Sequence, residues 1–366
     1  MPSTARTLML AALPAFALAC SDADPFEPAL HDTGPESTAQ VGAGFPLYGI
    51  GGIAAATPLH PCDASAHREF DFWLGAWDVY NPDGDLIGTN SVTSELDGCV
   101  VAEHWTNAGG VRGRSINTFD RETGQWHQTW VSANFAGHLR MAGGLDETGR
   151  MVLEGQRHAV NLGVTLFDEY RWTPVSDDEV EQFGSLTVPA AGFESTFLGI
   201  YERRDAISPA PEAPTTGCQA GGPAEQARQL DFWIGDWVVS TAAGKVLGTS
   251  TVSTDLSGCL LEERFRTPGG YEAVAFAAFD FYEQEWFRTY IDNRAEQLRW
   301  TGAFEAATGT MTFTGNEAGP GSSGEVLQQA TIAPDGSGAV RQTLRVSRDG
   351  GTSWSAAVVL VYKPTS

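Results

Sequence analysis

The sequence is poor in basic residues, because its 366 residues include 22 Lys and Arg against 46 Asp and Glu, a formal net charge of -24. Binding to nucleic acid depends on clustered basic side chains that displace counterions from the phosphates, so this class of function is excluded. The same charge argues against adhesion of the folded parts to an anionic membrane surface. The 42 Gly and 19 Pro also disfavour a mainly helical protein and favour a turn-rich β structure.

Common catalytic motifs are also missing. The chain has no P-loop, no G-x-S-x-G and no H-E-x-x-H, which weighs against the commonest enzyme classes. All seven His precede residue 159, so only the first half could supply the axial ligand that a haem needs. His104 and His127 there alternate with the residues expected to face inward. We therefore expect no cofactor and no metal.

Long apolar runs are absent after the N-terminus. Residues 1–20 contain one basic residue, Arg6, then an apolar run, and end in Ala-Leu-Ala-Cys, which predicts a signal peptide too short to span a bilayer. Cleavage before Cys20 has two interpretations: a lipobox that makes Cys20 a lipidation site, which we favour although its Leu stands one position late, or ordinary secretion. Residues 21–61 are predicted to be a disordered tether. We expect a cell-envelope lipoprotein, facing the periplasm or in the outer membrane, that contacts membrane only through this anchor.

The rest of the chain repeats itself at an offset of 160 residues. FDFWLGAWDV at 70–79 faces LDFWIGDWVV at 230–239, with six of ten positions identical. The segments that follow align without a gap. We therefore predict two tandem domains, 62–204 and 218–366. The Pro-, Ala- and Gly-rich segment 205–228 is predicted to be a linker that runs into the start of the second domain.

Each copy has the pattern of a series of short strands. In the first copy, β-type stretches separated by turn residues occur at 77–80, 86–94, 99–106, 113–119, 125–132, 137–143, 150–156, 165–173, 179–187 and 196–203. Ten short strands joined by tight turns predict an all-β protein made of two tandem antiparallel up-and-down β-barrels. One short helix per copy, at 64–74 and 224–234, is expected to stop at Gly75 or Gly235 and to plug one end of its barrel.

Four cysteines follow Cys20. Cys62 and Cys99 lie in the first copy, and Cys218 and Cys259 lie in the second. Each copy has one before its predicted helix and one at a Gly-Cys turn. In an exported protein this even and symmetric arrangement predicts two disulfides, Cys62–Cys99 and Cys218–Cys259, rather than a metal site.

The phrases FDFWLGAWDV, DGCVVAEHW and GRSINTFDRETGQWHQTWV resemble a family of exported bacterial domains of unknown function whose copies open with FDFW-x-G-x-W. The resemblance covers about residues 62–204 and 218–364. It implies a calycin-like barrel, the group that includes lipocalins, fatty-acid-binding proteins and nitrobindins. It implies no established activity.

Candidate binding residues lie on three consecutive predicted strands of the first copy. Because alternate side chains of a barrel strand point inward, one face of each strand can line the interior. The residues on these faces are Glu103, Trp105, Ser115, Asn117, Gln128 and Trp130. If they point inward, they form a ligand pocket with apolar walls and a few polar groups. The alternative is that they face solvent or satisfy one another inside a filled barrel.

The second copy keeps the carboxylate as Glu263 but has Ala275, Ala277 and Arg288 in place of Ser, Asn and Gln. We therefore expect the second barrel to bind a different ligand or none. Three functions remain open. We favour noncatalytic binding of a small apolar or amphipathic molecule; the alternatives are an enzyme that uses Glu103 as acid or base, and a scaffold with filled barrels. The sequence indicates no particular protein partner.

Overall fold

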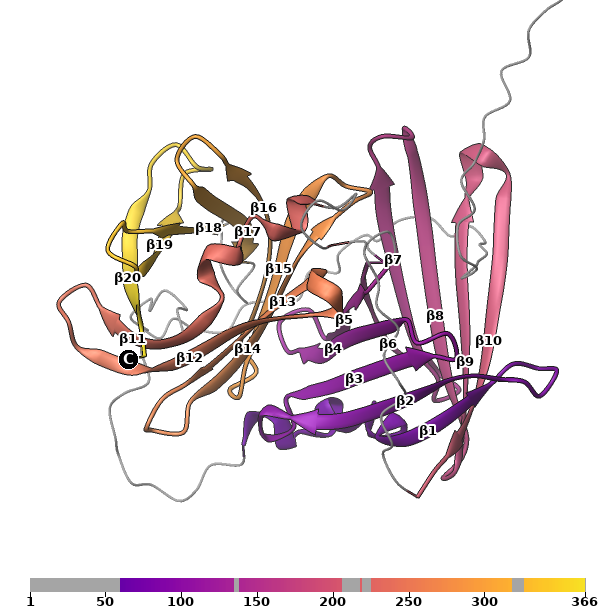
Figure 1. Cartoon of the computed structure of the whole chain (residues 1–366). Coiled ribbons are helices and arrows are strands. Elements are labelled where there is room, and N and C mark those ends of the chain that lie inside the picture. The colour runs from indigo at the N-terminus through magenta and orange to yellow at the C-terminus, as the bar shows by residue number, and fades with distance from the viewer. Residues whose placement is uncertain (1–59, 135–137, 206–217, 219–224, 318–325, 366) are drawn as a thin grey trace, which may run out of the picture.

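The structure is a computed structural model of the chain, and it describes residues 60–134, 138–205, 218, 225–317 and 326–365. The predicted signal peptide, the lipidation site Cys20 and nearly all of the tether lie outside the described residues. No helix in the described part is long and apolar enough to cross a membrane. The strands form two barrels, the first drawn in purple to pink and the second in orange to yellow (Figure 1).

The first barrel is a closed antiparallel meander. Its strands are β1 (Gly75–Tyr80), β2 (Leu86–Glu95), β3 (Val100–Asn107), β4 (Arg112–Asp120), β5 (Gln125–Ser132), β6 (Leu139–Leu145), β7 (Met151–Ala159), β8 (Val164–Ser176), β9 (Glu179–Val188) and β10 (Phe193–Arg203). Each strand pairs with the next one along the chain, and β1 closes the barrel by pairing with both β2 and β10. The predicted up-and-down barrel is confirmed, and each predicted stretch corresponds to a strand.

The second barrel repeats this topology. Its strands are β11 (Gly235–Thr241), β12 (Val246–Asp255), β13 (Leu260–Arg266), β14 (Glu272–Asp280), β15 (Glu285–Asp292), β16 (Gln297–Glu305), β17 (Thr310–Glu317), β18 (Val326–Pro334), β19 (Val340–Ser347) and β20 (Ser355–Pro364). Here β11 pairs with both β12 and β20. Two tandem ten-stranded barrels therefore make up the described part of the chain.

The helix predicted at the start of each copy consists of separate 3-10 turns. The short helices are η1 (Pro61–Asp63), η2 (Ser65–Arg68), η3 (Asp71–Trp73), η4 (Leu96–Gly98), η5 (Pro189–Ala191), η6 (Glu225–Arg228), η7 (Asp231–Trp233) and η8 (Leu256–Gly258). Phe70 and Trp73 are fully buried, and their rings contact Trp126 and Trp172 of the barrel wall. A segment this short gains little from helical hydrogen bonds, so the packing of its rings decides its shape.

A glycine begins the first strand of each barrel for a steric reason. Gly75 and Gly235 have φ values of +145° and +152°, which residues with a side chain rarely adopt. A Cβ atom on Gly75 would also lie 2.2 Å from the guanidinium of Arg203. The glycine thus lets the chain leave the plug and enter the barrel wall directly.

Both predicted disulfides are present. Cys62 is bonded to Cys99 and Cys218 to Cys259, with Cα–Cα distances of 5.1 and 5.0 Å. All four cysteines are buried. Each bond ties the plug segment to the turn that follows the second strand of its barrel, so the plug is fixed covalently to the wall.

The barrels pack against each other through the outer faces of β3–β5 and β13–β15. Ile116 of the first barrel lies in one buried apolar cluster with Phe276 and Phe287 of the second. Thr129 and Thr289, which are equivalent residues, hydrogen-bond each other at 2.8 Å. The contact is therefore approximately two-fold symmetric, like a homodimer interface within one chain.

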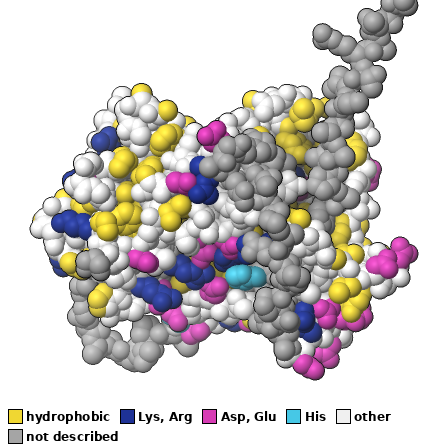
Figure 2. Space-filling model, viewed as in Figure 1, with side chains coloured by type: hydrophobic (Ala, Val, Ile, Leu, Met, Phe, Trp, Pro, Cys, Tyr) yellow, Lys and Arg dark blue, Asp and Glu magenta, His cyan; other side chains and the backbone are white. Residues whose placement is uncertain are grey.

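Ion pairs across this boundary follow the same symmetry. Arg140 of β6 contacts Glu283 in the turn between β14 and β15. Reciprocally, Arg299 of β16 contacts Asp120 beside the corresponding turn of the first barrel, at 2.6 Å. Basic and acidic side chains also lie together where the two barrels meet in Figure 2. The repeat predicts two tandem domains, and this shared boundary was not predicted from it.

Candidate ligand-binding site

The six candidate binding residues share the inner face of the first barrel. Glu103 of β3 pairs with Ser115 of β4, which pairs with Trp130 of β5. Asn117 pairs in the same way with Gln128. Trp105 belongs to the buried apolar cluster of this barrel's interior, and Trp130 packs against that cluster. The alternation along the strands therefore brings all six candidates to one side of the sheet.

The polar members of this group form one hydrogen-bonded network. Gln128 Nε2 donates to Asn117 Oδ1 at 2.8 Å, and Asn117 Nδ2 donates to Ser115 Oγ at 3.0 Å. Ser115 Oγ donates to Glu103 Oε2 at 2.7 Å, while Asn90 Nδ2 donates to Glu103 Oε1 at 2.8 Å. None of the five residues is more than 4% exposed. The network thus ends at the Glu103 carboxyl, each oxygen of which accepts one of these hydrogen bonds.

Glu103 lies in an environment that favours its neutral form. Burial raises the pKa of Glu103 to about 7, although the hydrogen bonds from Ser115 and Asn90 act in the opposite direction. No described Lys, Arg or His forms an ion pair with it. The hydroxyls of Tyr170 and Tyr201 stay neutral, since burial raises their pKa values as well. Glu103 therefore changes charge near neutral pH.

The rings of the interior tryptophans occupy the space that side chains on two wall glycines would fill. A Cβ atom on Gly88 would lie 2.4 Å from the ring of Trp105, and one on Gly113 would lie 2.2 Å from that of Trp130. Trp130 and Tyr170 both face inward, yet each is only partly buried. An inward ring with exposed surface borders space that solvent can reach. These rings are the accessible part of the candidate site.

Several interior polar residues were missed in the sequence analysis. Asn90 contacts the Glu103 carboxyl directly. Tyr201 donates a hydrogen bond to Gln182, and the Tyr362 hydroxyl of the second barrel lies 3.1 Å from Gln342 Oε1. The two glutamines are identical at the 160-residue offset. This repetition of a polar residue within a strand pattern is the signal that could have found the pair.

A second buried pair lies on β7 and β8 of the first barrel. Arg157 Nε and Nη2 each donate to the Asp168 carboxylate at 2.7 Å. The Arg157 guanidinium also lies 5.3 Å from the ring centroid of Tyr282, which comes from the second barrel. The charges of Arg157 and Asp168 neutralise each other, so Arg157 does not serve as a cation for Glu103.

The equivalent carboxylate of the second barrel has a different set of partners. Glu263 accepts hydrogen bonds from Ser250 at 3.0 Å, Tyr362 at 2.9 Å and Arg288 at 2.6 Å. Glu263 and Arg288 are each 3% exposed. The second barrel therefore neutralises its interior carboxylate with a cation from its own wall.

The neighbours of Arg288 explain how a guanidinium fits there. Ala275 and Ala277 replace the larger Ser115 and Asn117 of the first barrel, which leaves room for the longer side chain. The aromatic rings around the guanidinium, at 5.4, 5.9 and 5.8 Å from their centroids, are those of Trp233, Tyr290 and Trp300. Ring faces at this distance stabilise a cation.

Four histidines of the first barrel, including His104 and His127, lie outside its interior. His104 and His158 are exposed on its outer face. His127 lies 3.7 Å from Asp120, also outside, and His138 is buried between the barrels against Phe287. These four residues therefore offer no axial ligand beside the Glu103 network.

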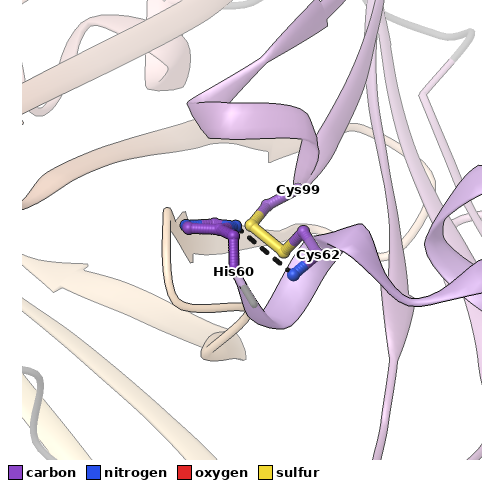
Figure 3. Close-up of side chains that lie close together, drawn as sticks. All are labelled: His60, Cys62 and Cys99. Atoms are coloured by element: carbon purple, nitrogen blue, oxygen red, sulfur yellow. Dashed lines mark hydrogen bonds between the residues drawn. A yellow bond between two sulfur atoms is a disulfide. The ribbon is translucent and has the colours of Figure 1, made fainter. Parts of the chain in front are cut away.

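His60 lies next to the first disulfide (Figure 3). Its Nδ1 accepts a hydrogen bond from the Cys62 backbone N–H at 3.4 Å, and its Nε2 lies 4.0 Å from Asp97. The imidazole and the sulfurs of Cys62 and Cys99 lie within 4.8 Å of one another, a spacing that free thiols could use for a metal. Because the sulfurs are bonded to each other, they offer no thiolate ligands. This close approach of His60 to Cys62 was not predicted from the sequence.

Comparison with known proteins adds little to this description. No protein-family model matches the chain, and no curated protein matches it. Among solved structures, it is similar to a protein of unknown function from the DUF3598 family of Nostoc punctiforme, at 12% sequence identity and a TM-score of 0.20. The alignment covers 82% of this chain and 100% of that chain. A likeness at this TM-score carries no argument about the site, and the resemblance to the FDFW-x-G-x-W family stays a prediction.

Proposed function

We propose that the first barrel binds a small apolar or amphipathic molecule without catalysing a reaction on it. The observation that carries this proposal is the exposed ring surface of the inward-facing Trp130 and Tyr170, beside a buried polar network. Apolar walls with a few placed polar groups are the usual composition of a small-molecule site. The apolar body of the ligand would contact the rings, and its polar end would face Glu103.

A buried acceptor without a donor supports the same site. Asn90 Oδ1 has no hydrogen-bond partner among the described residues, and Asn90 is only 3% exposed. Tyr201, which lies beside it, donates its hydroxyl proton to Gln182 instead. A buried acceptor left unpaired costs about 1–3 kcal/mol. A ligand that donates a hydrogen bond there would remove this cost.

Titration with the neutral fluorescent probe N-phenyl-1-naphthylamine tests the site. Trp130→Ala should weaken binding by roughly 1 kcal/mol or more, because it removes ring contact and buried apolar area. Trp354→Ala is the matched control, since Trp354 lies in the hairpin before β20 and donates to the Gly351 carbonyl. Equal loss of affinity in both variants, or no binding by the wild-type protein, would reject the site.

A catalytic role for Glu103 is the second candidate, because a carboxyl with a pKa near 7 suits a general acid or base. Against it, both carboxylate oxygens already accept hydrogen bonds, from Asn90 and Ser115. The two roles separate experimentally: a binding protein returns its ligand unchanged after long incubation, whereas an enzyme releases a product whose formation stops in Glu103→Gln.

We also propose that the protein is an exported lipoprotein attached through Cys20. The two buried disulfides support an oxidising compartment. The Ala-Leu-Ala-Cys sequence before the tether supports lipidation. Cys20→Ser should move the protein from the membrane fraction to the soluble fraction of fractionated cells. Retention of the variant in the membrane fraction would contradict the anchor.

A further inference from the structure

Both barrels have a buried carboxylate at the same position, but the partner of this carboxylate differs between them. Glu103 and Glu263 occupy equivalent positions on β3 and β13, and both are buried. Arg288, which pairs with Glu263 at 2.6 Å, stands where the first barrel has Gln128. Gln128 donates to Asn117 instead. The carboxylate site of the first barrel therefore lacks the positive charge that the second barrel supplies from its own sequence.

Aromatic residues occupy equivalent positions in both barrels. Trp233 and Tyr290, two of the rings around the second barrel's guanidinium, correspond to Trp73 and Trp130 of the first barrel. The first barrel adds Tyr170 on β8, where the second has Ala330. Because ring faces stabilise a nearby cation, these rings suit a cation brought by a ligand.

Acceptor groups beside Glu103 are also incompletely used. Glu263 accepts three hydrogen bonds from side chains, whereas Glu103 accepts two. Asn90 Oδ1, next to Glu103, has no partner among the described residues. A carboxylate has about four acceptor positions. The open positions call for N–H or O–H donors, and the missing charge favours N–H donors on a cation.

From these observations we infer that the ligand of the first barrel is a primary amine with an apolar body, whose ammonium group lies against Glu103 and Asn90. The inference rests on the proposed function, since it uses the same barrel interior. The ammonium takes the role that Arg288 has in the second barrel. A neutral alcohol of the same shape supplies a donor without the charge, and a carboxylic acid would be repelled by Glu103.

This ligand class brings a pH dependence with it. The other titratable groups that face Glu103 are Tyr170 and Tyr201, which stay neutral, and the Arg157–Asp168 pair on β7 and β8 is self-neutralised. Burial raises the pKa of Glu103 to about 7. Because an ammonium group prefers the ionised carboxylate, amine affinity should fall about tenfold per pH unit below pH 7 and level off above it.

Calorimetric titration of the full chain at pH 8 with octylamine and octan-1-ol tests the inference. Octylamine should bind at least tenfold more tightly than octan-1-ol, and Glu103→Gln should reduce its affinity to that of the alcohol. If both probes bind equally and Glu103→Gln changes neither, the amine inference is overturned and the apolar site remains. If neither probe binds, the proposed function fails as well.

Exchanging interior residues between the two barrels provides the matched test. A triple variant with Ser115→Ala, Asn117→Ala and Gln128→Arg gives the first barrel the partners of the second and should abolish octylamine binding. Arg288→Gln should conversely raise the stoichiometry from one octylamine to two. Circular dichroism checks that each variant folds. If Arg288→Gln does not fold, the triple variant decides alone, and wild-type octylamine affinity in it would overturn the inference.

Discussion

The charge of a buried carboxyl is neutralised either by a cation or by a proton, and this chain contains one example of each at equivalent positions. Glu263 is neutralised by Arg288 at 2.6 Å. Glu103 has two neutral donors, Asn90 and Ser115, and holds a proton up to about pH 7. The difference follows from the neighbouring residues and not from the depth of burial, which is 3 to 4% exposure for both glutamates.

We predict opposite effects of Glu103→Gln and Glu263→Gln on stability. The pKa of Glu103 is raised from 4.5 to about 7 in the fold, so the folded state binds the proton more tightly and stability falls as the pH rises between these values. Glu103→Gln removes this loss, and should unfold at higher urea concentration than the wild type at pH 8 but not at pH 4.5. The gain is on the order of 3 kcal/mol at most.

Glu263→Gln is the matched comparison. It leaves the Arg288 guanidinium buried without its carboxylate, so it should destabilise the protein by about 3–5 kcal/mol at pH 8. Both variants are measured by urea unfolding without added ligand. A destabilised Glu103→Gln variant at pH 8 would show that the free barrel already holds its carboxylate charged.

The inward face of the candidate site could be predicted from the sequence because barrel strands alternate strictly. Glu103 and Trp105 had to share a face once their strand was recognised. The partner of each group could not be predicted in the same way. Whether Glu103 meets Asn90 or Gln128 depends on strand register and side-chain length, which a pattern of alternation does not contain.

At the scale of elements, strands were easier to predict than plugs. The strands carry a repeated two-residue pattern bounded by turn residues, and this pattern reports burial directly. The plug segments show helical spacing of Phe70 and Trp73, but the structure has 3-10 turns there. Their shape is set by the rings that enter the barrel and by the disulfide, which are tertiary effects that spacing does not encode.

Each disulfide should stabilise the fold by holding its plug to the barrel wall. The loops that they close span 37 and 41 residues, so the loss of either bond should cost roughly 3–4 kcal/mol through the entropy of the unfolded chain. We predict this loss for Cys62→Ser with Cys99→Ser, and again for Cys218→Ser with Cys259→Ser. Urea unfolding with and without a reducing agent measures it.

Each double disulfide variant also serves as the experimental control for the other. If the plugs are equivalent, the two double variants should be destabilised similarly, and reduction should add nothing to a protein that lacks all four cysteines. Wild-type stability after complete reduction would contradict a stabilising role. Peptide mapping that joined Cys62 to Cys218 would contradict the pairing itself.

At the scale of the whole molecule, the two copies of the repeat share a buried boundary. Arg114 of β4 lies 2.7 Å from Glu262 and 3.1 Å from Asp255 of the second barrel, over the ring of Phe276. The sequence held a sign of this contact, since residues 273–279 of β14 are all apolar and do not alternate with polar ones. The structure buries nearly all of β14, as expected of a strand covered on both faces. The repeat alone predicted two separate domains.

We therefore predict that cutting the linker does not separate the barrels. The cut is made at a protease site inserted between residues 206 and 217. The buried boundary is held by apolar contacts and by ion pairs such as Arg114 with Glu262. After cleavage the two fragments should elute together in size-exclusion chromatography, at the mass of the intact chain. Phe276→Asp with the same cut is the control: a carboxylate placed in this apolar cluster, which is fully covered in the intact protein, should release two folded halves. Separate elution of the unmutated halves would mean that the boundary is too weak to hold without the linker. Each barrel would then be an independent domain, as the repeat pattern alone suggests.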